Sequence, residues 1–189
     1  MATQDSRIKI KRSTVTTTVP TVPSSNDHTD GTWIATDIYK GELFYNQADG
    51  VLWSRDDNGV SCLGGSVAVT LSSAQVLALN TTPITLVGAV SGYAIEVVSA
   101  SVNVEFNTTA YATNTGMLLI TDTATSQQAN ADIGATIAQI GKFRITEVGS
   151  PSLTQLITNK ALTVTVDSGD PTAGDSEITV HVTYRLIPA

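Results

Sequence analysis

The sequence predicts an all-β protein in which a small N-terminal β module precedes a jelly-roll-like antiparallel β-sandwich. Ser and Thr make up about a quarter of the 189 residues, and Val and Ile outnumber Leu. β-Branched side chains fit a pleated sheet and lose rotamer freedom in a helix, so this composition favours strands. Several segments also alternate apolar and polar residues with the period of a half-buried strand. The low charged fraction of 14%, beside 41% hydrophobic residues, argues against disorder.

The first predicted strand is basic. In the run RIKIKR, Ile8 and Ile10 alternate with basic residues, which predicts a strand with one buried face. The first 12 residues carry a charge of +3 and the remainder −10, in a chain whose net charge is −7. A basic strand can dock on an acidic partner, or it can be an edge strand whose lysines discourage unwanted pairing. The residues predicted to be available for docking are Arg7, Lys9, Lys11 and Arg12.

The rest of the module is expected to consist of a loop and short strands. Pro20 and Pro23 disfavour ladder pairing in the Thr-, Pro- and Ser-rich segment that ends at Asp30-Gly31. Short strands are expected around Trp33-Ile34, 43–45 and 51–53, separated by turns that contain Gly50 and Gly59. In so small a module the aromatic residues are expected to form the hydrophobic core, although a sugar-binding platform is an alternative. These core residues are Trp33, Phe44, Tyr45 and Trp53.

A domain boundary is predicted at Gly64-Gly65-Ser66, the most linker-like run in the chain. The two domains are therefore expected to span residues 1–64 and 65–189. Within the second, the segment 93–106 changes its apolar phase at Val97-Val98, which predicts a β-bulge there. The apolar run 117–120 lacks alternation and suggests a strand covered on both faces, as at a subunit interface.

The end of the second domain alternates strongly. Residues 162–167 and 178–186 are two such runs, and the polar connector SGDPTAGDS between them suggests a long final β-hairpin. The helical signal is weak: Ile133, Ile137 and Ile140 have helical spacing, but Gly134 and the β-branched residues make a short helix over 130–140 poor on propensity.

Two groups of motifs resemble components of phage particles. The basic strand, then Gly41–Asn46, Ala48-Asp49-Gly50 and the strand start Val51–Trp53, resemble the N-terminal domain of the phage major tropism determinant family. Toward the end of the chain, the run Asn-Lys-Ala-Leu at 159–162, the connector 169–175 and the Thr-Tyr-Arg run at 183–185 are similar to small β-sandwich proteins of phage particles.

The resemblance implies a non-enzymatic virion protein, usually a homotrimer, that is anchored through its N-terminal part to other virion proteins of the capsid or tail. The sequence departs from long tail fibres, because it has no heptad coiled coil, no Gly-rich shaft and no repeat array. It also lacks a variable C-terminal lectin domain like that of the tropism determinant. These departures favour a capsid decoration or head-fibre protein, and a short tail fibre that recognises a host glycan or surface protein is the alternative.

Residues with catalytic potential are few. His28 is expected in a solvated loop and His181 on the polar side of a strand, and Cys62 has no basic neighbour to activate its thiol. Asp170 and Asp175 could serve a depolymerising glycosidase or a calcium site, but aromatic platforms are scarce near them and the spacing does not fit an EF-hand. We therefore predict no catalytic residues, no metal and no cofactor.

The net charge of −7 disfavours nucleic acid and acidic membranes as partners. No apolar run reaches the length of a membrane span, and no signal peptide is evident. The predicted location is the virion.

Overall fold

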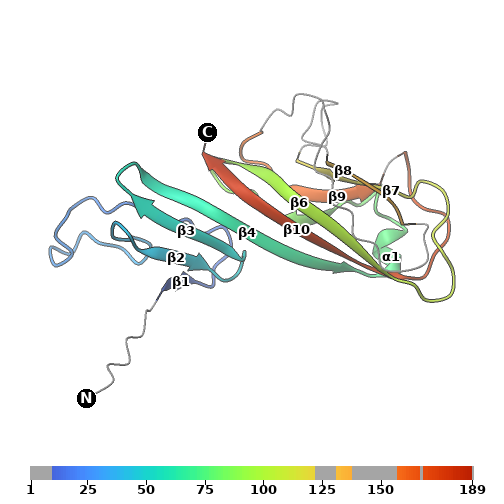
Figure 1. The fold of residues 1–189 in the computed structure, drawn as a ribbon, viewed down its shortest axis with the longest axis horizontal. Coiled ribbons are helices and arrows are strands. Elements are labelled where there is room, and N and C mark those ends of the chain that lie inside the picture. Colours follow the sequence, from blue (N-terminus) through green and yellow to red (C-terminus); the bar gives the residue numbers. More distant parts are fainter. Residues whose placement is uncertain (1–9, 122–130, 138–156, 167, 189) are drawn as a thin grey trace, which may run out of the picture. The chain divides into compact units, whose positions relative to one another are not determined.

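The computed structural model describes residues 10–121, 131–137, 157–166 and 168–188. Two compact units divide the chain, Met1–Leu63 (unit 1) and Gly64–Ala189 (unit 2). Strands dominate both, and one short helix is present among the described residues (Figure 1). The prediction of an all-β sandwich is confirmed. In the described ranges, no helix has the length and apolarity needed to cross a membrane.

In unit 1 the strands β1, β2 and β3 are neighbours in that order, and β3 is next to the start of β4. β1 pairs with β2 in parallel, and β2 forms an antiparallel hairpin with β3. Gly50 closes that hairpin at a φ of +68°, a conformation that costs glycine little. The strand bounds are β1 (Lys11–Ser13), β2 (Leu43–Asn46), β3 (Val51–Asp56) and β4 (Gly59–Leu71), the last of which ends in unit 2.

The strand predicted at Trp33-Ile34 does not form, and these residues lie in a loop. Side-chain hydrogen bonds shape the chain just before it. The Asp27 carboxylate accepts the N–H of Thr29 at 2.9 Å, and Asp30 accepts that of Thr32 at 2.9 Å. Such Asx turns satisfy backbone donors locally and so compete with strand pairing.

In the first sheet of unit 2, β10 (Glu177–Pro188) lies between β4 and β6 (Tyr93–Glu105) and is antiparallel to both. Every second residue of β10 from Ile178 to Leu186 is buried, as its alternation predicts. The register with β6 shifts between Thr183 and Tyr184, whose partners are Ser99 and Val97. Val98 is the extra residue and is 50% exposed, so the predicted bulge is confirmed.

The second sheet has the order β5-β9-β7-β8, and all its pairs are antiparallel. In β7, Met117, Leu119 and Ile120 are buried and Leu118 is half-buried, so this unit itself covers much of both faces. The Ser72 side chain and Gln75 form a capping box at the start of the helix. The bounds are α1 (Ser73–Val76), β5 (Ile84–Val87), β7 (Gly116–Ile120), β8 (Ala131–Thr136) and β9 (Leu162–Val166).

The predicted final hairpin is wrong, because β9 and β10 belong to different sheets. The connector between them is anchored by two carboxylates. Asp170 accepts the N–H groups of Asn80 and Thr81 at 2.7 and 3.0 Å, and Asp175 accepts those of Thr108 and Thr109 at 3.1 and 2.9 Å. Alternation along a strand specifies a buried face but not a partner strand, so the crossing could not be read from the pattern.

Two further expectations are corrected. The weakly indicated helix over 130–140 does not form in the described part of that range, because residues 131–136 form β8 and pair with β7; residues 130 and 138–140 lie outside the described residues. Gly64-Gly65-Ser66 is not a loop but part of β4, where Gly65 pairs with Tyr184. Gly64 has a φ of +139°, which explains a glycine inside a strand.

We expect Gly174→Ala to destabilise unit 2 strongly. Gly174 has a φ of +123°, and an added Cβ would fall on the ring of Tyr111, which is buried. The Tyr111 hydroxyl donates to the Ser176 carbonyl at 2.5 Å, so the ring cannot move away without breaking that bond. The loss should be about 3 kcal/mol or more, from backbone strain plus overpacking.

Urea unfolding at a constant m-value measures this loss. The matched control is Gly92→Ala, at a φ of +79° with no heavy atom within 4 Å of the added Cβ, where only the backbone strain of about 1 kcal/mol applies. Equal losses in the two variants would contradict the packing argument.

The stability of unit 2 should fall in acid. Hydrogen bonds from Thr108 and Thr109 hold the pKa of Asp175 below its ordinary value of 3.8, and those from Thr81 do the same for the pKa of Asp170. A lowered folded-state pKa stabilises the fold fully above the unfolded value, and this contribution is lost as the pH falls through the folded value. Urea midpoints should therefore decline from about pH 5 to about pH 2.

In the variant Asp175→Asn this decline should be shallower and the midpoint at neutral pH lower. Glu177→Gln removes the same charge from an exposed position on β10 and should leave the decline unchanged. An identical pH profile for Asp175→Asn and the wild type would refute the role of the carboxylate.

Candidate functional site

The inner face of the unit 1 sheet forms the core of the module. The pairings align Lys11, Phe44 and Trp53 across β1, β2 and β3. Phe44 and Trp53 are each 1% exposed, whereas Lys11 is half-buried and its ammonium donates to the backbone carbonyl of Asp37. Lys11 thus ties β1 to the loop that precedes β2, and its charge is directed into the module.

Asp37 organises that loop. Its buried carboxylate accepts the Thr21 hydroxyl at 2.6 Å and the Ile34 N–H at 2.8 Å. These hydrogen bonds, with the charges of Lys11 and Arg55, hold the pKa of Asp37 below its ordinary value. The carboxylate therefore stays ionised at neutral pH and holds the segment against the strands.

The outer face carries the alternate residues. Arg12 is aligned with Tyr45, and Tyr45 with Leu52, in a row across the same three strands. Arg12 and Tyr45 are exposed and Leu52 is half-buried. Ile10, predicted to be buried, is 45% exposed, because the side chain of Lys11, not that of Ile10, points toward the core. Arg7, Ile8 and Lys9 lie outside the described residues.

The predicted aromatic core is reduced to two of its four members. Phe44 and Trp53 are buried, and they are joined by Ile38 and Val51, which sequence reasoning did not assign to the core. Tyr45 does not belong to this core, since it follows Phe44 directly and the strand's alternation points it to the other face. Ile38 had no periodic signal, because the loop rather than a strand places it.

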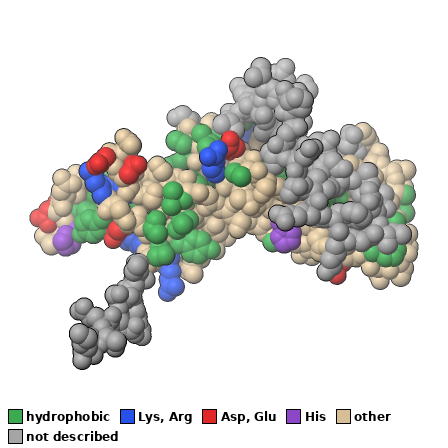
Figure 2. Space-filling model, in the orientation of Figure 1, with side chains coloured by type: hydrophobic (Ala, Val, Ile, Leu, Met, Phe, Trp, Pro, Cys, Tyr) green, Lys and Arg blue, Asp and Glu red, His purple; other side chains and the backbone are tan. Residues whose placement is uncertain are grey.

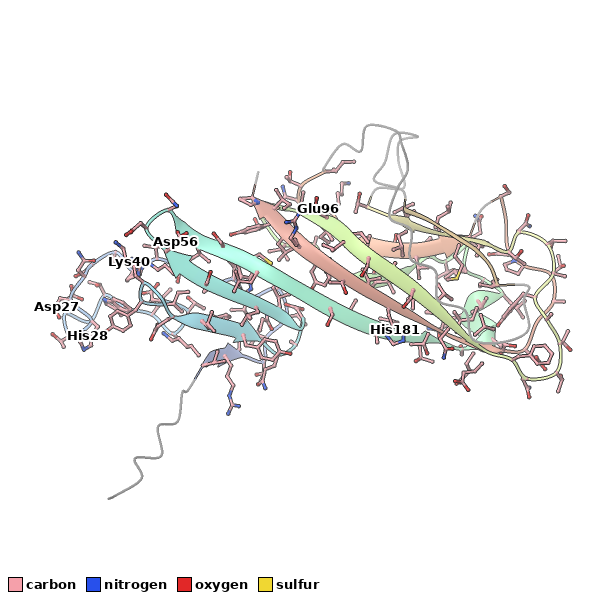
Figure 3. All side chains as sticks on the ribbon, in the orientation of Figure 1. Asp27, His28, Lys40, Asp56, Glu96 and His181 are labelled. Carbon is pink, nitrogen blue, oxygen red and sulfur yellow. The ribbon has the colours of Figure 1, made fainter. Side chains whose placement is uncertain are left out.

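The remaining core candidate, Trp33, belongs to an aromatic cluster in the loop. Its ring centroid lies 4.5 Å from that of Tyr39, and the His28 ring packs edge-on against both at 6.3 and 5.9 Å. His28 and Tyr39 are exposed and Trp33 is half-buried. Figure 3 shows His28 next to Asp27 in this loop. The Thr29 hydrogen bonds lower the pKa of Asp27, so an anionic carboxylate lies beside the rings.

The other histidine lies on the exposed face of the unit 2 sheet that contains β4, β10 and β6. His181 on β10 is aligned with Ala68 on β4 and Ser101 on β6 (Figure 3). A shallow hollow of about 460 Å³ surrounds it, and small side chains such as Ser66, Ser99 and Thr183 line it. Neither a carboxylate nor a thiol is among the lining residues, so His181 has no partner there for acid–base or nucleophilic catalysis.

The geometry of Asp170 and Asp175, in the connector between β9 and β10, indicates a structural role. The carboxylates of Asp170 and Asp175 are occupied by backbone and threonine donors, and the low pKa values that result disfavour the protonated form that a glycosidase acid requires. Across the described parts of the chain, no group of three or more His, Cys, Asp or Glu side chains is placed to hold a metal ion. Cys62 is half-buried in β4.

Comparison with known proteins identifies no family for this chain. No family model matches the chain, and no curated protein matches it. Among solved structures, it is similar to a chain described as "Cyanophage Pam1 capsid asymmetric unit", with a TM-score of 0.37 and 16% identity, over 65% of this chain and 82% of the other. A similarity of this degree does not establish a shared function.

The two faces of β2 should respond differently to truncation. Phe44→Ala removes a fully buried ring and should destabilise unit 1 by about 3–5 kcal/mol. Tyr45→Ser should cost about 1 kcal/mol or less, because its side chain is on the exposed face. Urea unfolding followed by tryptophan fluorescence reports on Trp53 in the same core. If Tyr45→Ser lowered the free energy of unfolding as much as Phe44→Ala, Tyr45 would have to belong to the core.

Proposed function

We propose that this chain is a non-enzymatic structural protein on the surface of a tailed-phage virion, serving as a capsid decoration or head-fibre protein. Unit 1 docks it on the particle, and the sandwich of unit 2 associates as a homotrimer and is displayed outward. Its partners in this proposal are other virion proteins.

One observation carries the proposal. The segments that resemble the tropism-determinant N-terminal domain family are brought together in unit 1: the end of the basic strand forms β1, the 41–46 motif leads into and forms β2, and β3 follows the Ala48-Asp49-Gly50 turn. The end of the basic strand pairs directly with the motif strand β2. The elements of the resemblance are therefore neighbours in space, which supports the proposal.

The chemistry of the described residues is consistent with a building block. Its carboxylates with shifted pKa values bind backbone or side-chain donors of the same unit, and no carboxylate or thiol is among the residues that line the hollow around His181. The uncharged exposed face around His181 suits packing between copies of a chain whose net charge of −7 otherwise repels them.

Receptor binding by a short tail fibre is the second candidate. The exposed His28, Trp33 and Tyr39 cluster favours it, because aromatic rings beside a carboxylate can bind a sugar by stacking and hydrogen bonding. Saturable binding of the full chain to host glycans, abolished by Tyr39→Ala, would favour this function over a purely structural one.

The proposal predicts that purified particles of the phage that encodes this chain contain many copies of it. Quantitative mass spectrometry of gradient-purified particles measures the copy number, and particles made without the gene provide the control. The chain should co-purify with heads after tails are separated from them. Its absence from particles would overturn the proposal, and its presence on tails alone would favour the second candidate.

A further inference from the structure

The outer face of β1, β2 and β3 exposes more apolar surface than a solvated sheet needs. Tyr45 is 38% exposed on β2, and Leu52 is its half-buried neighbour on β3. Leu43 extends the face along β2, and Ile10 extends it just before β1. Figure 2 shows hydrophobic side chains gathered on this part of unit 1, with basic side chains at their edge. Contiguous apolar surface rimmed by polar groups marks an interaction site.

The positively charged residue on this face, Arg12, has no ion-pair partner among the described residues. Among the basic residues that the structure describes, Arg12 alone has no side-chain partner. Lys11 and Arg55 donate to backbone carbonyls, Lys40 pairs with Asp57 and Arg185 with Glu96, and Lys160 is also engaged. Arg12 is exposed, so its guanidinium is available to a partner. Arg12 therefore points to an anion supplied from outside.

Arg12 and Tyr45 lie side by side in the row that continues to Leu52 on β3. Arginine and tyrosine are over-represented among residues that dominate binding energy at protein interfaces, because each combines large contact area with a polar end. A central tyrosine between an aliphatic and a cationic neighbour fits an apolar depression with a carboxylate at its rim.

We propose that the outer face of β1, β2 and β3, centred on Arg12, Tyr45 and Leu52, is the surface by which unit 1 binds a carboxylate-rimmed apolar site on another virion protein. This inference rests on the proposed function and assigns its docking residues. Nucleic acid fits poorly, because phosphate binding requires several cations and the face has one among the described residues. A second copy binding through the same face is the alternative occupant, and the sedimentation outcome below tests it.

The test uses full-length variants expressed during infection by a phage that lacks the gene. Arg12→Ser and Tyr45→Ser should each reduce the copies per purified particle by about tenfold or more. The matched controls are Lys40→Ser, which removes an exposed cation of the same unit, and Ile34→Ser, which removes an exposed apolar side chain of its loop. Both controls should be incorporated as the wild type is.

A second measurement adds purified chain to particles made without it, at increasing salt. The wild-type affinity should fall with salt, and that of Arg12→Ser should fall less, because one charge pair is missing. Circular dichroism tests whether each variant is folded. If Tyr45→Ser does not fold, the incorporation and the salt dependence of Arg12→Ser decide the test.

The outcomes are separable. Wild-type chain that never joins particles overturns the proposed function, and this inference with it. Wild-type incorporation with Arg12→Ser and Tyr45→Ser incorporated equally well overturns the docking face alone. Loss of self-association in those variants, seen by sedimentation of the 19.7 kDa chain, would assign the face to a second copy and overturn the proposal. Binding of the purified chain to vesicles of anionic lipid, lost in Arg12→Ser, would overturn it in favour of a membrane.

Discussion

The alternation of side chains between the two faces of a strand is the constraint on which both units depend. In unit 1 it places Phe44 and Trp53 inward and, one residue along, Tyr45 and Leu52 outward. A shift of one residue would expose the core and bury Arg12. In unit 2 the same rule buries alternate residues of β10 against the core and leaves His181 and its small neighbours on the outer face. The surface available for binding is thus a by-product of how each core is filled.

Carboxylates supply the second level of organisation, because they hold the segments that strands do not. Asp37 accepts a backbone N–H within the loop before β2. Asp170 and Asp175, in the connector between the two sheets of unit 2, accept backbone N–H groups of Asn80 and Thr109 and so hold the connector in place. Each accepts backbone N–H groups that would otherwise need other partners. These three carboxylates of the described residues therefore have a structural use.

These features are consistent with the structural role proposed above. The shifted pKa values of its carboxylates come from hydrogen bonds that stabilise the ionised form, the opposite of what a general acid needs. Exposed features that remain are surfaces: the face with Arg12 and Tyr45, the aromatic loop cluster and the uncharged face around His181. In the proposals above, these surfaces are assigned respectively to another virion protein, to a sugar and to another copy of the chain.

The sequence by itself determined the fold class, the strands with clear alternation and the bulge at Val98, because period and composition are local properties of the chain. The tertiary structure alone decided which strands are partners: β9 and β10 read as a hairpin but lie in different sheets, since hydrogen bonds from distant backbone groups hold their connector. It also decided the roles of neighbours such as Lys11 and Arg12, or Phe44 and Tyr45. The sequence predicted the same role for both members of each pair. The pairing of β1, β2 and β3 places Lys11 and Phe44 on the inner face and Arg12 and Tyr45 on the outer face.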